Sequence, residues 1–366
     1  MTIRTFDIFR YQLPLTHPLH LRGQDLTARS GAVIRLENND GAVGWGEIAP
    51  LPGFSDESLD HALSQAAMLR YRLRGTDIPD NLEELSGGFE RWLAPFKLAP
   101  SVRSGMEMTV LCLLAKSEGV TLARLVSHNP HQLVPLNGLI SGSLDELPAH
   151  IDRVTASACT AVKIKVGQRS VDEDIAIVRK ARTLLPDTVV IRLDANRAWE
   201  WKTAVAFAEG IAAISIEYIE EPLQDTSDLA RFAAHTGLPI ALDETVRECT
   251  PETLPLFDGL KAIIVRPLLL GGFENAMRFA RRARSQTINT VLSSGVESGL
   301  GTTMLIQLAA AMTPDPIPVG LDTYSWFADD ILSSRLKQTD GGYDVARAWD
   351  TLDTIDLARL TPVPHE

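Results

Sequence analysis

The feature that most constrains this chain is the repeated alternation, from Leu133 onward, of short apolar segments with longer stretches of helical periodicity. This alternation is typical of βα units, whose strands pair in parallel and are buried on both faces. A count of eight favours a closed barrel over an open sheet, with the active site at the carboxyl ends of the strands. The predicted strands are 133–137, 161–166, 188–194, 215–220, 239–243, 262–266, 290–294 and 317–321.

The first 130 residues lack this alternation, and their pattern predicts a small α+β domain. Residues 3–13, 32–37 and 42–47 are typical of strands, and the sequence NNDG before the last of them predicts a hairpin turn. A polar loop is expected over 15–30 and a helix over 102–118. The irregular segment 325–366 is expected to pack back on this domain. We therefore predict a modified TIM (β/α) barrel, 131–324, with an α+β domain built from 1–130 and the C-terminal tail 325–366.

Composition excludes several classes of partner. The formal net charge of −12 argues against binding nucleic acid or an anionic membrane, since both need clustered Lys and Arg. The three cysteines are widely spaced and the N-terminus lacks a signal pattern, and no apolar run reaches the roughly 18 residues of a membrane helix. We expect a cytoplasmic protein, a monomer or small homo-oligomer, that acts on a small molecule.

Charged side chains stand at the carboxyl ends of the predicted strands. Lys163 and Lys165 are two residues apart in one strand, so their side chains point to the same face. A lone acid at a strand end is more often a helix cap, but several acids sharing one barrel mouth repel one another unless a divalent cation neutralises them. Oxygen ligands favour Mg²⁺, with Mn²⁺ as a substitute. The next three strands each end in acids: Asp194, then Glu220 and Glu221, then Asp243 and Glu244.

The lysine pair predicts a base for proton abstraction. A lysine is a poor base at neutral pH, but a neighbouring cation and a low-dielectric site both lower its pKa. Lys163 is therefore expected to make Lys165 a general base, which removes a proton next to a substrate carboxylate bound at the metal. Arg266, across the barrel, would place a fixed positive charge against the resulting enediolate.

Several segments together resemble the enolase superfamily. They are the lysine pair of 163–165, RLDANRAW at 192–199, EEP at 220–222, LDET at 242–245 and SSGVESGLG at 293–301. The sequences WGEIAPLPGFS at 45–55 and GLDT at 320–323 make the chain most similar to the dehydratases of that superfamily that form 2-succinylbenzoate in menaquinone biosynthesis. The resemblance extends over nearly the whole chain.

The resemblance implies a site and a reaction. The first domain would cap the barrel, with loops around Arg22 and Leu51 closing over it. Water would be eliminated, in the syn sense, from 2-succinyl-6-hydroxy-2,4-cyclohexadiene-1-carboxylate, with Lys165 removing the proton and helping the hydroxide leave. The implied Mg²⁺ ligands are Asp194, Glu220 and Asp243, and Ser293, Ser294 and Gly320 would lie near the succinyl tail. Asn196 is a further expected substrate-binding residue. Glu221 and Glu244 stand next to ligands in the sequence, so we expect them to orient the metal site.

Arg266 departs from the superfamily pattern, in which this position normally holds lysine. Arginine stays protonated in proteins, so Arg266 cannot serve as a second base. A racemase needs bases on both faces of the substrate, whereas a syn dehydration needs one, so the arginine favours the dehydratase. The alternatives are an N-acylamino-acid or dipeptide racemase, a muconate cycloisomerase, or a non-catalytic barrel that binds a carboxylate or a protein partner.

Overall fold

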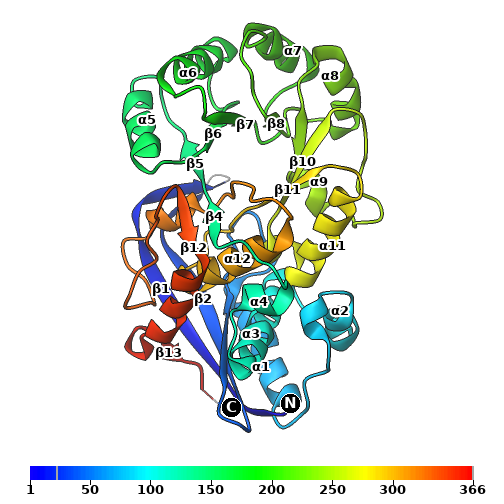
Figure 1. Ribbon diagram of the computed structural model, residues 1–366, viewed down its shortest axis with the longest axis vertical. Coiled ribbons are helices and arrows are strands. Elements are labelled where there is room, and N and C mark those ends of the chain that lie inside the picture. The colour runs from blue at the N-terminus through cyan, green and yellow to red at the C-terminus, as the bar shows by residue number, and fades with distance from the viewer. Residues whose placement is uncertain (22–23, 365–366) are drawn as a thin grey trace.

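The structure is a computed structural model that describes residues 1–21 and 24–364 (Figure 1). The strands are β1 (Ile3–Leu21), β2 (Gln24–Asn38), β3 (Val43–Ile48), β4 (Leu133–Pro135), β5 (Asn137–Ile140), β6 (Ala161–Lys165), β7 (Val190–Asp194), β8 (Tyr218–Glu220), β9 (Ile240–Leu242), β10 (Leu260–Val265), β11 (Asn289–Leu292), β12 (Gly342–Asp344) and β13 (Thr361–Pro362). The α-helices are α1 (Leu59–Leu73), α2 (Gly88–Leu93), α3 (Pro100–Glu118), α4 (Leu122–Val126), α5 (Leu147–Ala156), α6 (Val171–Leu184), α7 (Trp201–Gly210), α8 (Leu229–Thr236), α9 (Glu244–Arg247), α10 (Pro267–Leu270), α11 (Phe273–Arg284), α12 (Gly299–Met312) and α13 (Val345–Asp350). Short 3-10 turns are η1 (Leu82–Glu84), η2 (Ala94–Phe96), η3 (Thr226–Asp228), η4 (Asp322–Trp326), η5 (Thr351–Thr354) and η6 (Leu357–Arg359).

The N-terminal sheet is antiparallel, with strand order β13-β1-β2-β3. The predicted polar loop over 15–30 is wrong, because β1 and β2 continue as a paired ribbon in which Leu19 lies opposite Leu26 and Leu21 opposite Gln24. Backbone hydrogen bonds hold such a ribbon together whatever its side chains, so its polar sequence does not signal a strand. Within this ribbon, the Pro14 carbonyl oxygen accepts a hydrogen bond from Ala328 N, and Thr16 Oγ1 donates one to Trp326 O.

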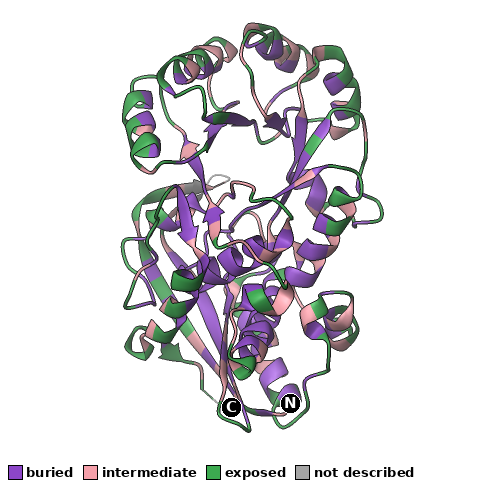
Figure 2. Cartoon of the chain, viewed as in Figure 1, coloured by how far each residue is buried: buried purple, intermediate pink, exposed green. Residues whose placement is uncertain are grey.

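Helix α3 covers one face of this sheet at very short range. Gly44 and Gly46 of β3 lie against the helix, and a Cβ on Gly46 would stand 2.2 Å from both the Gly105 carbonyl oxygen and Thr109 Oγ1. Only glycine permits this approach of strand and helix backbones. The predicted helix over 102–118 is confirmed, beginning at Pro100, and most of its residues are buried (Figure 2).

The central sheet is parallel and curls with helices on its outer side (Figure 1), in the order β11-β10-β9-β8-β7-β6-β5. The eighth predicted strand, 317–321, forms single bridges instead of a full strand, pairing Val319 with Leu136 and Gly320 with Ser293. Asn137 N donates to Val319 O at 2.9 Å and Gly320 N to Leu292 O at 2.8 Å. These bonds join both edges of the sheet, so the predicted barrel fold is confirmed.

The first predicted barrel strand is misplaced. Residues 133–135 form β4, which pairs antiparallel with β12 outside the barrel, and the first barrel strand is β5, beginning at Asn137. The apolar run continues from one into the other, so its sequence does not show where the chain changes partner. β12 comes from the C-terminal segment, which also adds β13 to the N-terminal sheet.

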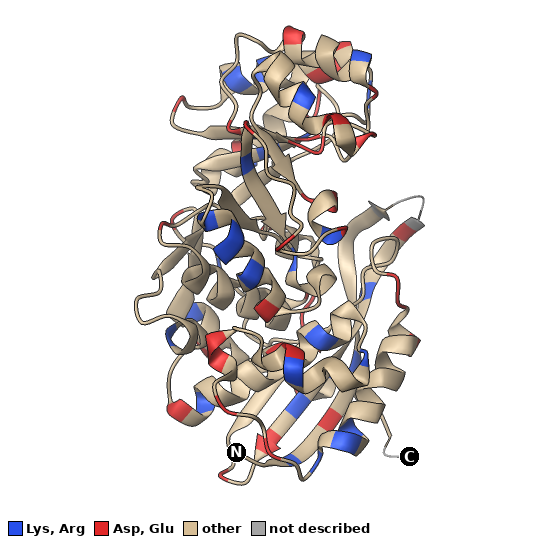
Figure 3. Cartoon of the chain, turned by 90° about the vertical axis from the view of Figure 1, so that its right-hand side faces the viewer, with Lys and Arg blue, Asp and Glu red and all other residues tan. Residues whose placement is uncertain are grey.

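No helix in the described part of the chain is long and apolar enough to cross a membrane. Acidic and basic residues are interleaved over the helices and the sheet (Figure 3). All three cysteines are free, with Cys112 and Cys159 buried and Cys249 partly exposed.

Candidate active site

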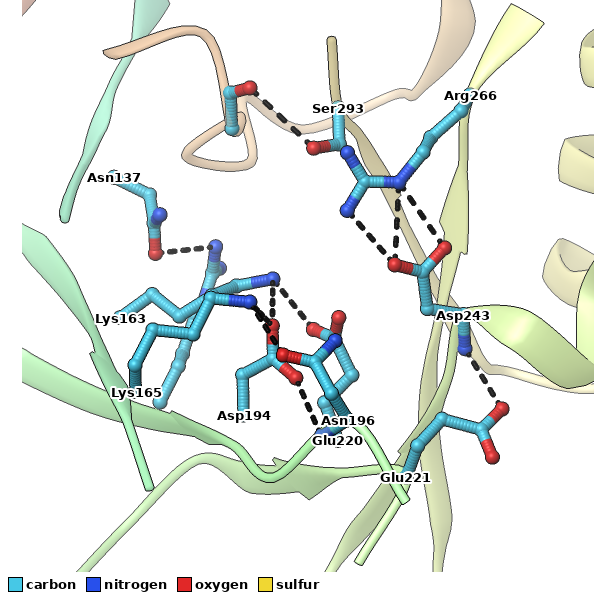
Figure 4. A network of polar contacts seen from close by, with 12 residues as sticks. Asn137, Lys163, Lys165, Asp194, Asn196, Glu220, Glu221, Asp243, Arg266 and Ser293 are labelled. Atoms are coloured by element: carbon cyan, nitrogen blue, oxygen red, sulfur yellow. Dashed lines mark hydrogen bonds and ion pairs between the residues drawn. The ribbon is translucent and has the colours of Figure 1, made fainter. Parts of the chain in front are cut away.

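The lysine pair lies at the carboxyl end of β6 and points into the barrel mouth (Figure 4). The Lys163 side chain is 8% exposed, and its Nζ donates to Glu220 Oε2 at 2.6 Å. The Lys165 side chain is 23% exposed, and its Nζ donates to Asp194 Oδ2 at 2.6 Å and to Asn196 Oδ1 at 2.8 Å. Two lysines of one strand therefore have different access to the mouth.

Strand register brings the first two acids beside the lysines. Lys165, Asp194 and Glu220 are lateral neighbours across β6, β7 and β8. Both acids are fully buried, and Asp194 also lies 3.6 Å from Lys163 Nζ. The convergence predicted from the strand ends is therefore present for this part of the site.

Arg266, at the end of β10, forms an ion pair with the third acid, Asp243. Its Nη2 donates to Asp243 Oδ2 at 2.8 Å, its Nε lies 3.2 Å from both Asp243 oxygens, and its Nη1 donates to Ser294 O at 2.6 Å. The guanidinium thus connects the end of β9 to the loop that follows β11. Figure 4 shows this pair across the mouth from the lysines.

Burial and ion pairing shift the titration of these groups in opposite directions. Burial disfavours the charged form of Lys163, but Glu220 and Asp194 outweigh burial and raise its pKa above the usual range. Burial alone would raise the pKa of Asp194, yet Lys165 and Lys163 bring it below its usual value. The pKa of Glu220 is raised, chiefly by burial and then by Asp194. Lys163 therefore stays positively charged inside the barrel.

The acids offer the right donors for a hard cation. Glu220 Oε1 and Glu244 Oε2 are buried without a hydrogen-bond partner, a costly state that an approaching cation would relieve. Within residues 1–21 and 24–364, no three His, Cys, Asp or Glu side chains form a ready metal centre. The ammonium groups of Lys163 and Lys165, on β6, and the guanidinium of Arg266, after β10, form ion pairs with these acids.

The backbone after these strands adopts uncommon conformations. Asn196, Arg197 and Glu221 have φ values of 46°, 59° and 41°, in the left-handed region that non-glycine residues rarely adopt. Glu221 Oε1 accepts from the backbone N–H of Asp243 at 3.1 Å and of Thr245 at 2.8 Å. Glu221 thus links the loop after β8 to the end of β9.

Two further side chains form hydrogen bonds between the loops at this part of the mouth. Asn196 Nδ2 donates to Glu244 Oε1 at 3.2 Å. Arg197, which we did not single out from sequence, donates to Glu221 Oε2 at 3.1 Å and to Glu248 Oε1 at 2.6 Å. The one feature of the sequence that could have identified Arg197 is its position next to Asn196.

Three of the other predicted binding residues, Ser293, Ser294 and Gly320, lie together, and Ser294 O binds Arg266. Ser293 Oγ donates to Gly320 O at 3.4 Å, and Ser294 Oγ is hydrogen-bonded to Thr323 Oγ1. A Cβ on Gly320 would stand 2.7 Å from Ser293 Oγ, so the absence of a side chain lets Ser293 pack closely against Gly320. Leu51 is buried in the loop after β3, with its N–H bound to Ser55 Oγ at 2.9 Å. Arg22 lies outside the described residues.

Family comparisons divide the chain into two matched parts. Residues 146–349 match the family described as "Enolase C-terminal domain-like", and residues 3–113 match "MenC, N-terminal domain". The first match spans the parallel strands from β6 to β11, which carry the charged side chains of the mouth.

Comparison with whole proteins gives relatives of similar length. The o-succinylbenzoate synthase of Pasteurella multocida (strain Pm70) is 34% identical, covering 99% of this chain and 98% of the relative. That of Klebsiella pneumoniae (strain 342) is 32% identical, covering 99% and 100%. Among solved structures, muconate lactonizing enzyme from Pseudomonas fluorescens has a TM-score of 0.83 at 21% identity, covering 98% of each chain. The L-Ala-D/L-Glu epimerase of Bacillus subtilis has a TM-score of 0.81 at 23% identity, covering 94% of this chain and 98% of that one. At these identities the two structures show the shared fold alone.

Proposed function

The chain belongs to the enolase superfamily and, within it, to the o-succinylbenzoate synthases, which are lyases, and from this premise we propose its reaction in detail. The substrate is 2-succinyl-6-hydroxy-2,4-cyclohexadiene-1-carboxylate, and elimination of water gives 2-succinylbenzoate. The observation that carries the proposal is the asymmetry of the mouth: one side has Lys165, whose amine can accept a proton, and the other has Arg266, which stays protonated and is held by Asp243 and Ser294 O.

Lys165 acts as the base. As a neutral amine it takes the proton from the carbon that bears the carboxylate, and the carbon–hydrogen electron pair moves into an enediolate. When the electrons return, the carbon–oxygen bond to the ring hydroxyl breaks, and the proton on Lys165 passes to the departing oxygen to form water. The amine is regenerated, so one lysine on one face completes the cycle. Lys163, which is less exposed, supplies fixed charge beside it.

Arg266 stabilises negative charge from the opposite side. It remains protonated, and its bonds to Asp243 and to Ser294 O hold its orientation. A cation that is already oriented needs no reorganisation as charge develops on the substrate. Because Arg266 cannot accept a proton, inversion at the α-carbon has no second base, which argues against racemisation.

Asp194, Glu220 and Asp243 are the residues that would hold Mg²⁺. Their carboxylate oxygens and the unpaired Glu220 Oε1 support this assignment. When bound, the ion would supply positive charge to the substrate carboxylate. Asp194 and Asp243 would then share their charge between the ion and their present partners, Lys165 and Arg266.

The N-terminal domain and C-terminal tail form the cap of this site. We assign 1–130 and 325–366 to the cap and 131–324 to the barrel, supported by the pairing of β13 with β1 and by the contact between Thr16 and Trp326. The loops around Arg22 and Leu51 would close over the substrate, while Asn196, Ser293, Ser294 and Gly320 line the barrel side. We place the reaction in the cytoplasm.

Turnover by the purified protein tests the proposal. With substrate and Mg²⁺, we expect formation of 2-succinylbenzoate by the wild type and a loss of roughly 10³-fold or more in kcat for Lys165→Ala. Lys180→Ala, which removes an exposed lysine from α6, is the matched control and should retain full activity. An inactive wild type, or normal turnover by Lys165→Ala, would refute the assignment.

A further inference from the structure

The loop between β11 and α12 has a conformation that its own sequence does not favour. Val296 has a φ of 63°, and a β-branched residue in this region is strained, at a cost of about 1–3 kcal/mol. Inside the loop, Gly295 N donates to Glu297 Oε2 at 2.7 Å and Val296 N to Ser294 Oγ at 3.3 Å. A strained turn persists only when surrounding contacts determine its shape.

One of those contacts is Arg29, from β2 of the N-terminal sheet. Its guanidinium is buried, with the residue 1% exposed, and it donates to four backbone carbonyls. Two belong to the loop after β11, with Nε to Val296 O at 3.0 Å and Nη2 to Gly295 O at 3.2 Å. The other two, Ala49 O at 2.7 Å and Pro50 O at 3.0 Å, lie just before Leu51 in the capping loop. One side chain therefore joins the two loops.

The other contact is Glu47, from the adjacent strand β3. Its carboxylate is buried and accepts from Ser298 N at 2.9 Å, Ser298 Oγ at 2.6 Å and Gly301 N at 2.8 Å, and also from Tyr11 Oη. These N–H groups belong to the first turn of α12, where a negative charge is favoured. A Cβ on Gly301 would stand 2.5 Å from Glu47 Oε2, so the helix start is closely fitted to this acid.

The fixed loop leads directly to the catalytic residues. Ser294 O accepts from Arg266 Nη1 at 2.6 Å, and Arg266 in turn holds Asp243. The loop also carries Ser293 and Ser294, which would face the succinyl group. We propose that Arg29 and Glu47 are positioning residues, which hold the turn 294–298 so that Arg266 and the two serines meet the substrate correctly. This inference rests on the proposed function.

Kinetics of Glu47→Gln test the positioning role against a matched control. Glu107 of α3 is also fully buried, and it also accepts from the N-terminus of a barrel helix, at Glu274 N of α11 with 2.8 Å, without touching the turn 294–298. We expect KM for the substrate to rise about tenfold in Glu47→Gln, with a lower kcat, and to stay near the wild-type value in Glu107→Gln. Arg29→Lys keeps the charge but loses the planar fork that reaches both loops, so its KM should lie between those of the wild type and Glu47→Gln.

A merely structural role predicts a different result. Partial unfolding lowers the active fraction and hence the apparent kcat, and it leaves KM unchanged. A wild-type KM in both Glu47→Gln and Arg29→Lys would therefore overturn the inference.

Hydrogen exchange separates a failure of this inference from a failure of the proposed function. In the ligand-free protein, amides of 295–301 should exchange faster in Glu47→Gln than in Glu107→Gln, because the acceptor of Ser298 N and Gly301 N loses its charge. This comparison remains valid even if the wild type does not turn over the substrate. Equal exchange in the two variants would exclude Glu47 as the residue that fixes the turn.

Discussion

Three cations share the barrel mouth, and their surroundings give them different chemical capacities. Lys163 is enclosed by Glu220 and Asp194, which hold it in its charged form. Lys165 reaches further out and shares Asp194 with it. Arg266 is engaged on two sides, by Asp243 and by Ser294 O. Only Lys165 combines access to substrate with the capacity to give and take a proton.

Replacement of Arg266 tests whether the chemistry is one-sided. Arg266→Lys restores a side chain that can lose its proton, on the face opposite Lys165. In D₂O with an N-succinylamino acid, we expect α-deuteration with inversion by this variant and none by the wild type, as followed by NMR and chiral chromatography.

Arg266→Met is the control for this experiment, because it removes the charge without supplying a base. It should show no inversion, and its dehydratase kcat should fall about 10²-fold, since one oriented cation is lost. Inversion by the wild type would contradict the one-base mechanism.

At the scale of elements, glycine residues determine how closely the N-terminal sheet packs on helix α3. Strand β3 carries Glu47 to the start of α12, and it can do so because Gly44 and Gly46 let it lie directly on α3. A similar fit occurs from the helix side, where a Cβ on Gly105 would stand 2.5 Å from Ile48 Cγ1. Small residues on both elements therefore set the height of the strand above the helix.

Gly46→Ala is expected to destabilise the protein by about 2–3 kcal/mol, because its Cβ would overlap the backbone of α3. Urea unfolding followed by circular dichroism measures this cost. Gly41→Ala is the control: its Cβ would meet no atom within 4 Å, and only its φ of 86° opposes the change, at about 1 kcal/mol. A cost for Gly46→Ala no larger than that for Gly41→Ala would mean that the sheet can move away from the helix.

At the scale of the whole molecule, buried acids at helix N-termini join the N-terminal part of the chain to the barrel. Glu47 caps α12 and Glu107 caps α11, while Glu274 of α11 accepts from Gly87 N and Glu90 N at the start of α2. Burial raises the pKa of Glu107 and of Glu297 to about 7. Glu107 joins α3 to α11, and Glu297 lies in the turn after β11, so we expect the stability of the protein to depend on pH near neutrality.

The direction of this sensitivity follows from proton linkage. The folded protein holds the protons of Glu107 and Glu297 up to about pH 7, whereas the unfolded chain loses them near 4.5. Between these values the native state binds more protons, so the free energy of unfolding falls as pH rises. Each group accounts for roughly 3 kcal/mol across the window.

The double variant Glu107→Gln/Glu297→Gln should lack this contribution. Urea unfolding at pH 5 and pH 7.5 gives the difference in stability between wild type and variant, and that difference should move in favour of the variant at the higher pH. All other titrating groups are common to both proteins and cancel. A difference independent of pH would show that the two acids titrate normally in the folded protein.

The sequence by itself determined the barrel, most of its strands and the residues at their ends. Alternation along a strand and periodicity along a helix are local properties, and parallel βα topology then places Lys163, Lys165 and the following acids at one mouth. Their motifs also indicated the family. These predictions rest on local patterns and do not depend on which distant segments come into contact.

Only the tertiary structure decided which partners each segment takes. In the structure, β1 and β2 extend through the predicted loop, residues 133–135 pair with β12, and Arg266 forms an ion pair with Asp243. The tertiary structure also brought Arg29 and Glu47, more than 240 residues away in sequence, to the turn after β11. Backbone pairing and buried charge pairing depend on what lies opposite in space, and a local pattern in the sequence does not contain that information.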